Sequence, residues 1–169
     1  LYMGSEFLHR SMNQGETWER ISGDLTNGAK EGNVAFGTLT TISESKFQFG
    51  LLYVGSDDGK IHVSKDGGAS WQLISGNLPQ NLWVSRVAAS THKKERVYAT
   101  LNGYRNDNFE SYAFVSEDFG ATWNPISNGL TEAVNVIVED SANENILYVG
   151  TDNGLFISLD KGITWQDFS

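Results

Sequence analysis

The sequence predicts an all-β chain, a fragment of a β-propeller with about four blades, each a four-stranded antiparallel sheet, and with the first blade incomplete. One motif, hydroxyl-x-Asp-x-Gly-x-hydroxyl-Trp, occurs four times, with Asn replacing Asp in the first copy. Blade repeats run from about 40 to about 50 residues. The motif tryptophans, Trp18, Trp71, Trp123 and Trp165, follow one another after 53, 52 and 42 residues. Eighteen glycines against two prolines are typical of many short strands joined by turns.

Each copy of the motif is interpreted as the turn between the third and fourth strands of a blade. An Asp side chain can accept hydrogen bonds from N–H groups of its own turn, and Gly takes positive φ at little cost. The Trp opens the next strand and offers a large apolar face for burial. We therefore expect the four acceptors to stabilise turns, with the uncharged Asn turn the least firmly held; they are Asn13, Asp66, Asp118 and Asp160.

Strands of alternating or β-branched residues fill the space between these turns. The first blade offers strands at 1–4, 7–11 and 18–22, and the second at 38–43, 51–55, 60–64 and 71–75. The third offers strands at 84–89, 97–101, 112–116 and 123–127, and the fourth at 134–138, 146–150, 155–158 and 165–168. We expect blades at about 1–23, 34–76, 84–128 and 134–169, forming a single partial domain of a larger ring, because a propeller sheet with an unpaired edge is normally completed.

Composition excludes several classes of function. A net charge of -9 disfavours nucleic acid as a partner, and no apolar run is long enough to span a membrane. The chain has no cysteine, and its three histidines, His9, His62 and His92, are scattered, so no zinc or other metal site and no cofactor is predicted. Calcium is the one alternative, on the oxygen-rich pairs Asp57–Asp58 and Asn106–Asn108.

The loops at the end of the blades away from the motif turns are the expected binding surface. They are 23–34, 57–59, 76–83, 102–111, 129–133 and 152–154, and the insertion at 102–111 is unusual among them. Trp, Tyr and Arg dominate binding hot spots, which singles out Trp83, Arg86, Tyr104 and Arg105. The alternatives are that Trp83 covers a joint between blades and that Arg105 pairs with Asp107 to shape the insertion.

The motif and its flanks resemble the Asp-box (BNR) repeat, which occurs in sialidases, xyloglucanase-type hydrolases, sortilin-type receptors and photosystem II assembly factors. The stretches 147–158, 37–42, 83–86 and 103–109 look like the sortilin-like and glycosyl hydrolase-like proteins of bacteria. The resemblance covers nearly the whole chain. It implies a secreted or cell-envelope protein with two propellers, and it leaves the activity open because the fold serves enzymes, receptors and scaffolds.

Two functions are weighed from these residues. The first is a binding or scaffold module for a glycan or protein ligand at the loop face, packed against the rest of its own propeller or a second propeller. The alternative is a glycoside hydrolase, which needs two carboxylates flanking a sugar bond. Weak candidates for these are Asp57, Asp58, Asp107 and Glu110, with Asp24 and Asp152 at the same end. A sialidase would need three arginines, and only Arg86 and Arg105 are suitably placed.

Overall fold

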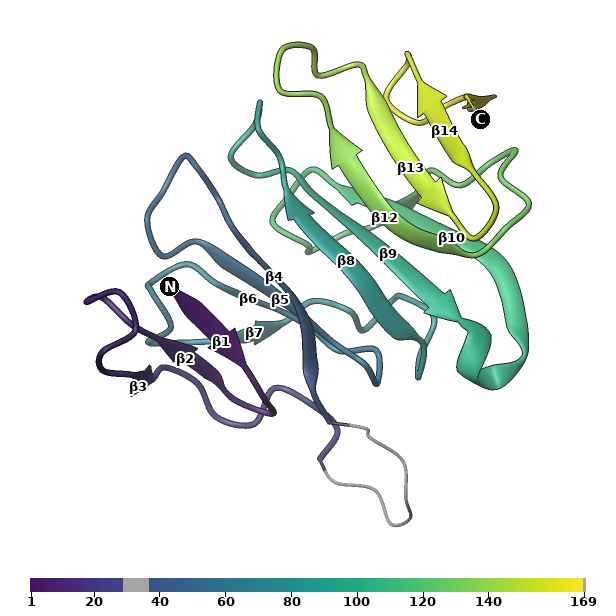
Figure 1. Ribbon diagram of the computed structural model, residues 1–169. Helices are drawn as coiled ribbons and strands as arrows, with labels where there is room; N and C mark the ends of the chain where they lie inside the picture. The colour runs from purple at the N-terminus through teal and green to yellow at the C-terminus, as the bar shows by residue number, and fades with distance from the viewer. Residues whose placement is uncertain (29–36, 169) are drawn as a thin grey trace.

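The computed structural model describes residues 1–28 and 37–168 and shows four antiparallel sheets in a row (Figure 1). The first sheet has three strands, β1 (Tyr2–Gly4), β2 (Leu8–Arg10) and β3 (Glu19–Arg20). The second has β4 (Leu39–Glu44), β5 (Leu52–Ser56), β6 (Ile61–Ser64) and β7 (Gln72–Leu73). The predicted all-β class, with an incomplete first blade, is confirmed.

The third and fourth sheets repeat the same meander, in which each strand pairs with the next along the chain. The third contains β8 (Trp83–Ala89), β9 (Val97–Gly103), β10 (Asn108–Ser116) and β11 (Asn124–Pro125), with the 3-10 turn η1 (Tyr104–Asn106) between β9 and β10. The fourth contains β12 (Val134–Glu139), β13 (Leu147–Thr151), β14 (Leu155–Ser158) and β15 (Gln166–Asp167). This order of strands is that of propeller blades.

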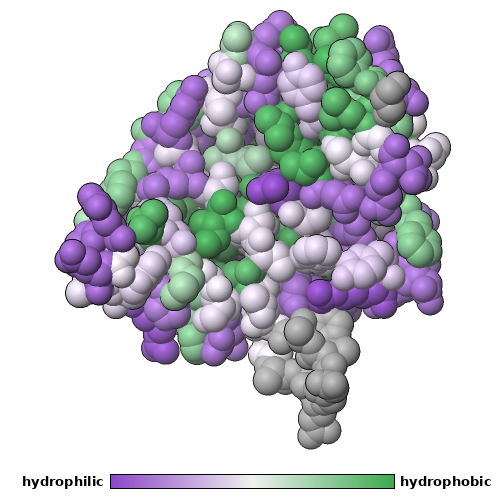
Figure 2. Space-filling model, viewed as in Figure 1, coloured by the Kyte–Doolittle hydropathy of each residue, from purple (hydrophilic) through white to green (hydrophobic). Residues whose placement is uncertain are grey.

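The core lies between neighbouring sheets. Leu8, Leu52 and Val54 are fully buried between the first and second sheets, and Ile61, Val84 and Leu101 between the second and third. A third cluster, which includes Leu147 and Val149, joins the third sheet to the fourth. Figure 2 shows pale and hydrophobic side chains across the middle of one face, with hydrophilic side chains more frequent toward its edges.

The inner strands β4, β8 and β12 are bonded to one another through a shared irregularity. The pairing with the second strand shifts between Leu39 and Thr41 in β4, and at the equivalent place in β8. There the Thr40 hydroxyl donates to the carbonyl of Val84 at 2.7 Å, and the Ser85 hydroxyl donates to that of Val134 at 3.0 Å. A bulge re-aims one side chain, and here it aims a hydroxyl at the next sheet.

The outer strands are shorter than the sequence predicts. Each of β3, β7, β11 and β15 has two residues, where the sequence predicted four or five. All of these residues are exposed. Short outer strands limit unwanted pairing at a sheet edge. The Trp before β7, β11 and β15 turns toward the preceding sheet, where its indole N–H donates to a main-chain carbonyl.

The insertion at 102–111, predicted as a loop, is an ordered hairpin. The strand β9 runs on to Gly103, η1 makes one turn, and β10 begins at Asn108 with a register shift before Tyr112. A Cβ at Gly103 would lie 2.7 Å from the carbonyl oxygen of Asn108, so the hairpin closes only around glycine. The sequence prediction placed the third strand at 112–116 because the predicted third strands of the other blades are no longer than this.

A buried ionic cluster lies between the third and fourth sheets, at the end that carries the motif turns. Arg96 Nη1 contacts Glu139 at 3.2 Å and Glu144 at 3.0 Å, and Arg96 Nε contacts Glu117 at 2.6 Å. The side chains of Arg96 and Glu139 are 6% and 3% exposed, and Tyr98 donates to the same carboxylate at 2.8 Å. None of the helices in the described ranges could cross a membrane.

Candidate binding site at the loop end

The hairpin with η1 at its tip carries exposed aromatic and cationic groups at the loop end. Tyr104 N–H donates to the side-chain oxygen of Asn102 at 2.9 Å, which starts the turn. Asp107, in the left-handed conformation with φ 53°, ends it by donating its N–H to the carbonyl of Tyr104. Asp tolerates that conformation better than most residues. The turn therefore projects Tyr104 and Arg105 to the surface, where both are exposed.

Arg105 is held by contacts with three residues. Its Nη1 lies 3.3 Å from the carboxylate of Asp57, and its Nε donates to the Tyr104 hydroxyl at 3.2 Å. Its guanidinium carbon lies 5.4 Å from the centre of the Trp83 ring, within the range of a cation–π contact. Contact with Tyr104 and then Asp57 raises the pKa of Arg105 against the opposing effect of partial burial. We call Asp57, Trp83, Tyr104 and Arg105 the Arg105 cluster.

The two rings of the cluster meet edge to face. Their centroids are 5.7 Å apart, with 63° between the ring planes. This is the preferred geometry of an aromatic pair. The Trp83 ring comes from the first residue of β8 and the Tyr104 ring from the hairpin after β9, and Trp83 pairs with Asn102 across those two strands. The sheet therefore fixes the separation of the two aromatic side chains.

The carboxylate under Arg105 is part of the scaffold. Asp57 is 3% exposed, and one of its oxygens accepts the N–H groups of Gly37 at 2.8 Å and Thr38 at 3.0 Å. Asp58, 1% exposed, accepts the N–H of Asn27 at 2.7 Å and the Ser56 hydroxyl at 2.6 Å. Asp58 thus ties the second sheet to the segment that follows the first sheet, and Asp57 ties the start of β4 to the hairpin of the third sheet.

The other candidate acids are exposed, two of them in the same hairpin. Asp24 binds Thr26, Glu110 accepts the Tyr112 hydroxyl, and Asp152 accepts the amide of Asn135. Asp107 is exposed at the end of η1. Within the described residues Asp24, Glu110 and Asp152 therefore bind different partners, and Asp107 and Glu110 share one hairpin. Arg86 is exposed on β8, further along the strand than Trp83, and lies outside the Arg105 cluster.

Asn81 and Asn106 were not singled out by the sequence. The side-chain amide of Asn106 donates to the carbonyl of Asn81 at 3.0 Å, which links the hairpin to the loop before β8. Asn81 has φ of 61°, a conformation in which Asn is enriched. The sequence signal that could have identified Asn81 as a turn residue was its position after Pro79-Gln80 in a loop. In the described ranges no group of three or more His, Asp or Glu residues could hold a metal ion.

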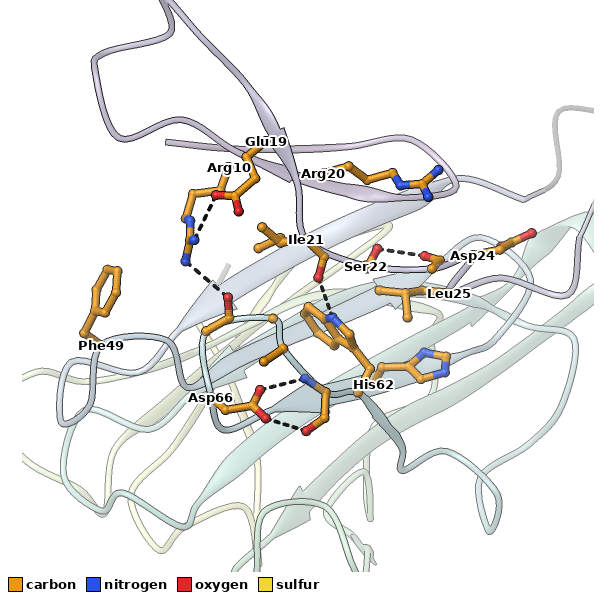
Figure 3. Close-up of a pocket in the computed structure, with 16 residues that line it drawn as sticks. Arg10, Glu19, Arg20, Ile21, Ser22, Asp24, Leu25, Phe49, His62 and Asp66 are labelled. Carbon is orange, nitrogen blue, oxygen red and sulfur yellow. Dashed lines mark hydrogen bonds and ion pairs between the residues drawn. The ribbon is translucent and has the colours of Figure 1, made fainter.

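A cavity lies between the first and second sheets, lined both by the motif turn of the second sheet and by Asp24 (Figure 3). It has a volume of about 940 Å³, and its lining includes Arg10, Glu19, His62 and Asp66. The Arg10 guanidinium binds Glu19 at 3.0 Å and the carbonyl of Gly67 at 3.2 Å. Burial, with a smaller effect of Lys60, lowers the pKa of His62 to about 4. Arg10 and Glu19 are thus paired with each other, and the low pKa keeps His62 neutral at pH 7.

The motif turn that lines this cavity has the same internal bonds as its three counterparts. In the second sheet, Ser64 donates to Asp66, and the N–H and hydroxyl of Ser70 donate to its two oxygens at 2.9 Å and 2.5 Å. The hydrogen bonds from Thr164 lower the pKa of Asp160, the equivalent residue of the fourth sheet, to about 2. Asn13 is bonded to Ser11 and Thr17 in the same places, so the loss of charge removes no contact.

Known proteins resemble this chain over most of its length. The family model Sortilin-Vps10 (sortilin, neurotensin receptor 3) matches residues 6–133. A xyloglucanase of Hypocrea jecorina (strain QM6a) is 30% identical over 141 residues, which cover 71% of the chain and 16% of the relative. An ancestral GH74 enzyme has a TM-score of 0.72 at 23% identity, with 99% of this chain and 22% of that chain covered.

A second solved structure agrees with this likeness. The GH74 enzyme of Niastella koreensis has a TM-score of 0.72 at 22% identity, with 98% of this chain and 27% of that chain covered. The chain therefore spans well under a third of the length of each relative. The two structures show the same fold.

Proposed function

This chain belongs to the Sortilin-Vps10 family, and on that premise we propose that it is a recognition module that binds a glycan or protein ligand at its loop end. The Arg105 cluster is the observation that supports the proposal. Trp, Tyr and Arg are the residues that carry most binding energy in interfaces. Their side chains are held before a ligand arrives, so little ordering entropy is lost on binding.

The glycoside hydrolase is the alternative, and the similarity to a xyloglucanase favours it. Such an enzyme needs two carboxyl groups about 5 Å apart for retention or roughly 6.5–9.5 Å apart for inversion. At this loop end two of the candidate acids, Asp57 and Asp58, are buried and bonded to main-chain N–H groups. A catalytic acid must reach the sugar, so the burial of both supports binding over hydrolysis by this part of the protein.

The wider setting of the module is also proposed here. By resemblance to its relatives, it works in a secreted or cell-envelope protein and packs against further blades of its own propeller or a second propeller. Stacking of sugar rings on Tyr104 and Trp83 makes a β-glucan a suitable probe, and the similarity to a xyloglucanase makes xyloglucan the first β-glucan to try. A glycan array separates this ligand from other sugars.

The test compares variants of the cluster by calorimetry with xyloglucan oligosaccharides and with the best array hit. Tyr104→Ala and Arg105→Lys should each weaken binding by at least about tenfold, as hot-spot residues do. Phe47→Ala, which removes an exposed aromatic from the opposite end, should leave binding unchanged. Binding that survives both cluster variants contradicts the proposal. Turnover of aryl glycosides that is abolished by Asp107→Asn would establish the hydrolase instead.

A further inference from the structure

The three joints, as we call the contacts between neighbouring sheets, are built on one plan. In each, the indole N–H of a motif tryptophan donates to the carbonyl of an isoleucine on the preceding sheet. The pairs are Trp71 with Ile21 at 2.9 Å, Trp123 with Ile74 at 2.8 Å and Trp165 with Ile126 at 2.6 Å. Residues at the same place in the repeat can therefore be compared from one joint to the next.

The joint between the first and second sheets lacks side chains that fill the other joints. Two residues before the motif serine, β6 carries His62, where β10 and β14 carry Phe114 and Phe156. Those two phenylalanines pack against the cores of their joints. Three residues after the motif serine stands Gly67, where the third sheet has Phe119, which also packs against the core. A polar ring and a glycine thus replace apolar side chains.

Two arginines stand where the second sheet has apolar residues. Arg10 on β2 and Arg20 on β3 occupy the places of Val63 and Leu73. The Arg10 guanidinium reaches across the joint and donates to the carbonyl of Gly67 at 3.2 Å. The first joint is therefore lined by polar groups at positions where the next joint has apolar ones.

The cavity of about 940 Å³ between the first and second sheets lies at these positions. Its volume is near the upper end of the range for ligand pockets, about 300–1,000 Å³. Figure 3 shows Phe49 toward one end of it, and His62 and Asp24 toward the other. Its lining includes residues of β3 and none of β1, the strand at the other edge of the first sheet. The cavity is thus a groove between two neighbouring sheets, and we call it the His62 groove.

Charge in the His62 groove is nearly balanced. Its lining contains two arginines and three acids, Arg10, Arg20, Glu19, Asp24 and Asp66. Arg10 is paired with Glu19 at 3.0 Å, and Asp66 accepts both the N–H and the hydroxyl of Ser70. Burial lowers the pKa of His62 to about 4, so this ring is neutral at pH 7. A charged ligand therefore gains little net attraction here, and the groove favours a neutral one.

The groove has hydrogen-bonding groups that lack a partner. Arg10 Nε and His62 Nδ1 are buried and have no partner within the part of the chain that the structure describes. Such atoms are rare in proteins and cost stability. A hydroxyl group both donates and accepts, so it can bond to either atom after a small rotation of the side chain. Glu19, whose side chain is 65% exposed, adds carboxylate oxygens that accept from further hydroxyls.

Apolar surface lies beside these polar groups. Phe49 is 67% exposed at one end of the groove, and Ile21, Leu25 and Trp71 also line it. A sugar ring has an apolar face, which packs on aromatic side chains, and a rim of hydroxyl groups. A ligand pocket for such a ring combines apolar walls with a few placed polar groups.

We propose that the His62 groove is a second binding site, for a neutral oligosaccharide. Three observations support it: the near balance of charge, the unpartnered donors and acceptors, and the exposed aromatic surface. None of the residues of the Arg105 cluster lines this groove, so the second site goes beyond the loop-end site proposed above and does not depend on it.

The test follows the indole N–H signals of two tryptophans by NMR while this chain is titrated with cellohexaose, mannohexaose or chitohexaose. Trp71 reports on the His62 groove, and Trp83 reports on the Arg105 cluster. We expect the Trp71 signal to move with a Kd of about 1 mM or below for at least one of these sugars. Movement of the Trp83 signal alone would support the loop-end site and overturn the groove site, so the two proposals fail separately.

Filling the groove tests its assignment. Gly67→Phe introduces the residue that the third sheet carries at Phe119, whose φ of 62° is close to the 73° of Gly67. The Trp71 response should weaken at least about tenfold, and the Trp83 signal should behave as in the parent chain. Gly67→Ala is the matched control, because its Cβ has the same φ and meets only Arg10 Nη1 at 3.5 Å. This variant should still bind.

A second variant removes aromatic surface without filling the groove. Phe49→Ser, at an exposed position, should weaken the Trp71 response about fivefold through the loss of one aromatic contact. It decides the question if circular dichroism shows that Gly67→Phe does not fold. No Trp71 response to any of the three sugars at about 10 mM, a response unchanged in Gly67→Phe or Phe49→Ser, or binding of an acidic or basic peptide in their place would each overturn the proposal.

Discussion

Removal of the Glu139 side chain should destabilise the fold more than removal of an exposed acid, such as Glu144, from the ionic cluster around Arg96. Its carboxylate accepts the Ser90 hydroxyl at 2.9 and 2.8 Å, the Tyr98 hydroxyl at 2.8 Å and Arg96 at 3.2 Å. Glu139→Ala leaves these donors in a buried site without the carboxylate that accepts from them. Breaking a buried pair costs about 3–5 kcal/mol, and we expect the lower end, about 3 kcal/mol, because Arg96 keeps Glu117 and Glu144.

The assay is urea denaturation followed by circular dichroism at pH 7. Glu144→Ala is the matched control, since it removes another partner of Arg96 whose side chain is 43% exposed. An exposed pair contributes under about 1 kcal/mol. Equal losses for the two variants would refute the reasoning that burial sets the cost.

The Glu139 carboxylate should also make the free energy of unfolding depend on pH. Burial alone would raise the pKa of Glu139, but hydrogen bonds from Ser90, Thr91 and Tyr98 outweigh it and lower the pKa below 4.5. The unfolded chain therefore binds this proton more readily than the folded one. The stabilisation that the Glu139 carboxylate contributes is complete well above pH 4.5. It is lost as the pH falls through the lower pKa of the folded state. Glu139→Ala should flatten the decline of unfolding free energy below pH 4.5.

Three further changes test other parts of the fold, each by urea denaturation. Trp123→Phe, which leaves the Ile74 carbonyl without the indole N–H, should cost about 1–2 kcal/mol. The same change at the exposed Trp18 should cost less. Gly120→Ala should cost about 2–3 kcal/mol, because φ is +87° and the new Cβ meets Ile74; a neutral result would mean that the joint can open. The low pKa of His62, about 4, makes stability fall as the pH drops from about 6.5 toward 4, so a slope that persists in His62→Phe would contradict the burial argument.

Much of the fold could be predicted from the sequence because the motif is local. A turn, a glycine and a tryptophan at fixed spacing identify the last hairpin of each sheet, and the strands between can be counted. The partner of the indole could not be predicted, since Trp123 reaches a carbonyl 49 residues earlier in the chain. The sequence therefore indicated a turn, and the structure shows that the same segment also bonds one sheet to its neighbour.

The candidate site was less predictable than the fold. Trp83, Tyr104 and Arg105 were singled out by residue type, and the structure brings these three together. Their anchor was not predicted, because Asp57 lies 48 residues from Arg105 and looked like a loop acid. Its burial depends on the main-chain N–H groups of Gly37 and Thr38, and no pattern of side chains records which N–H groups a loop will turn inward.

The indole N–H of Trp71, Trp123 and Trp165 donates to a main-chain carbonyl oxygen, which every residue possesses. This hydrogen bond can therefore form whatever side chain the neighbour carries at that point, provided its backbone has the same pairing. Duplication or loss of one blade-length segment of the gene would rebuild the contact without compensating substitutions, so architectures of this type can change their number of blades in single genetic steps.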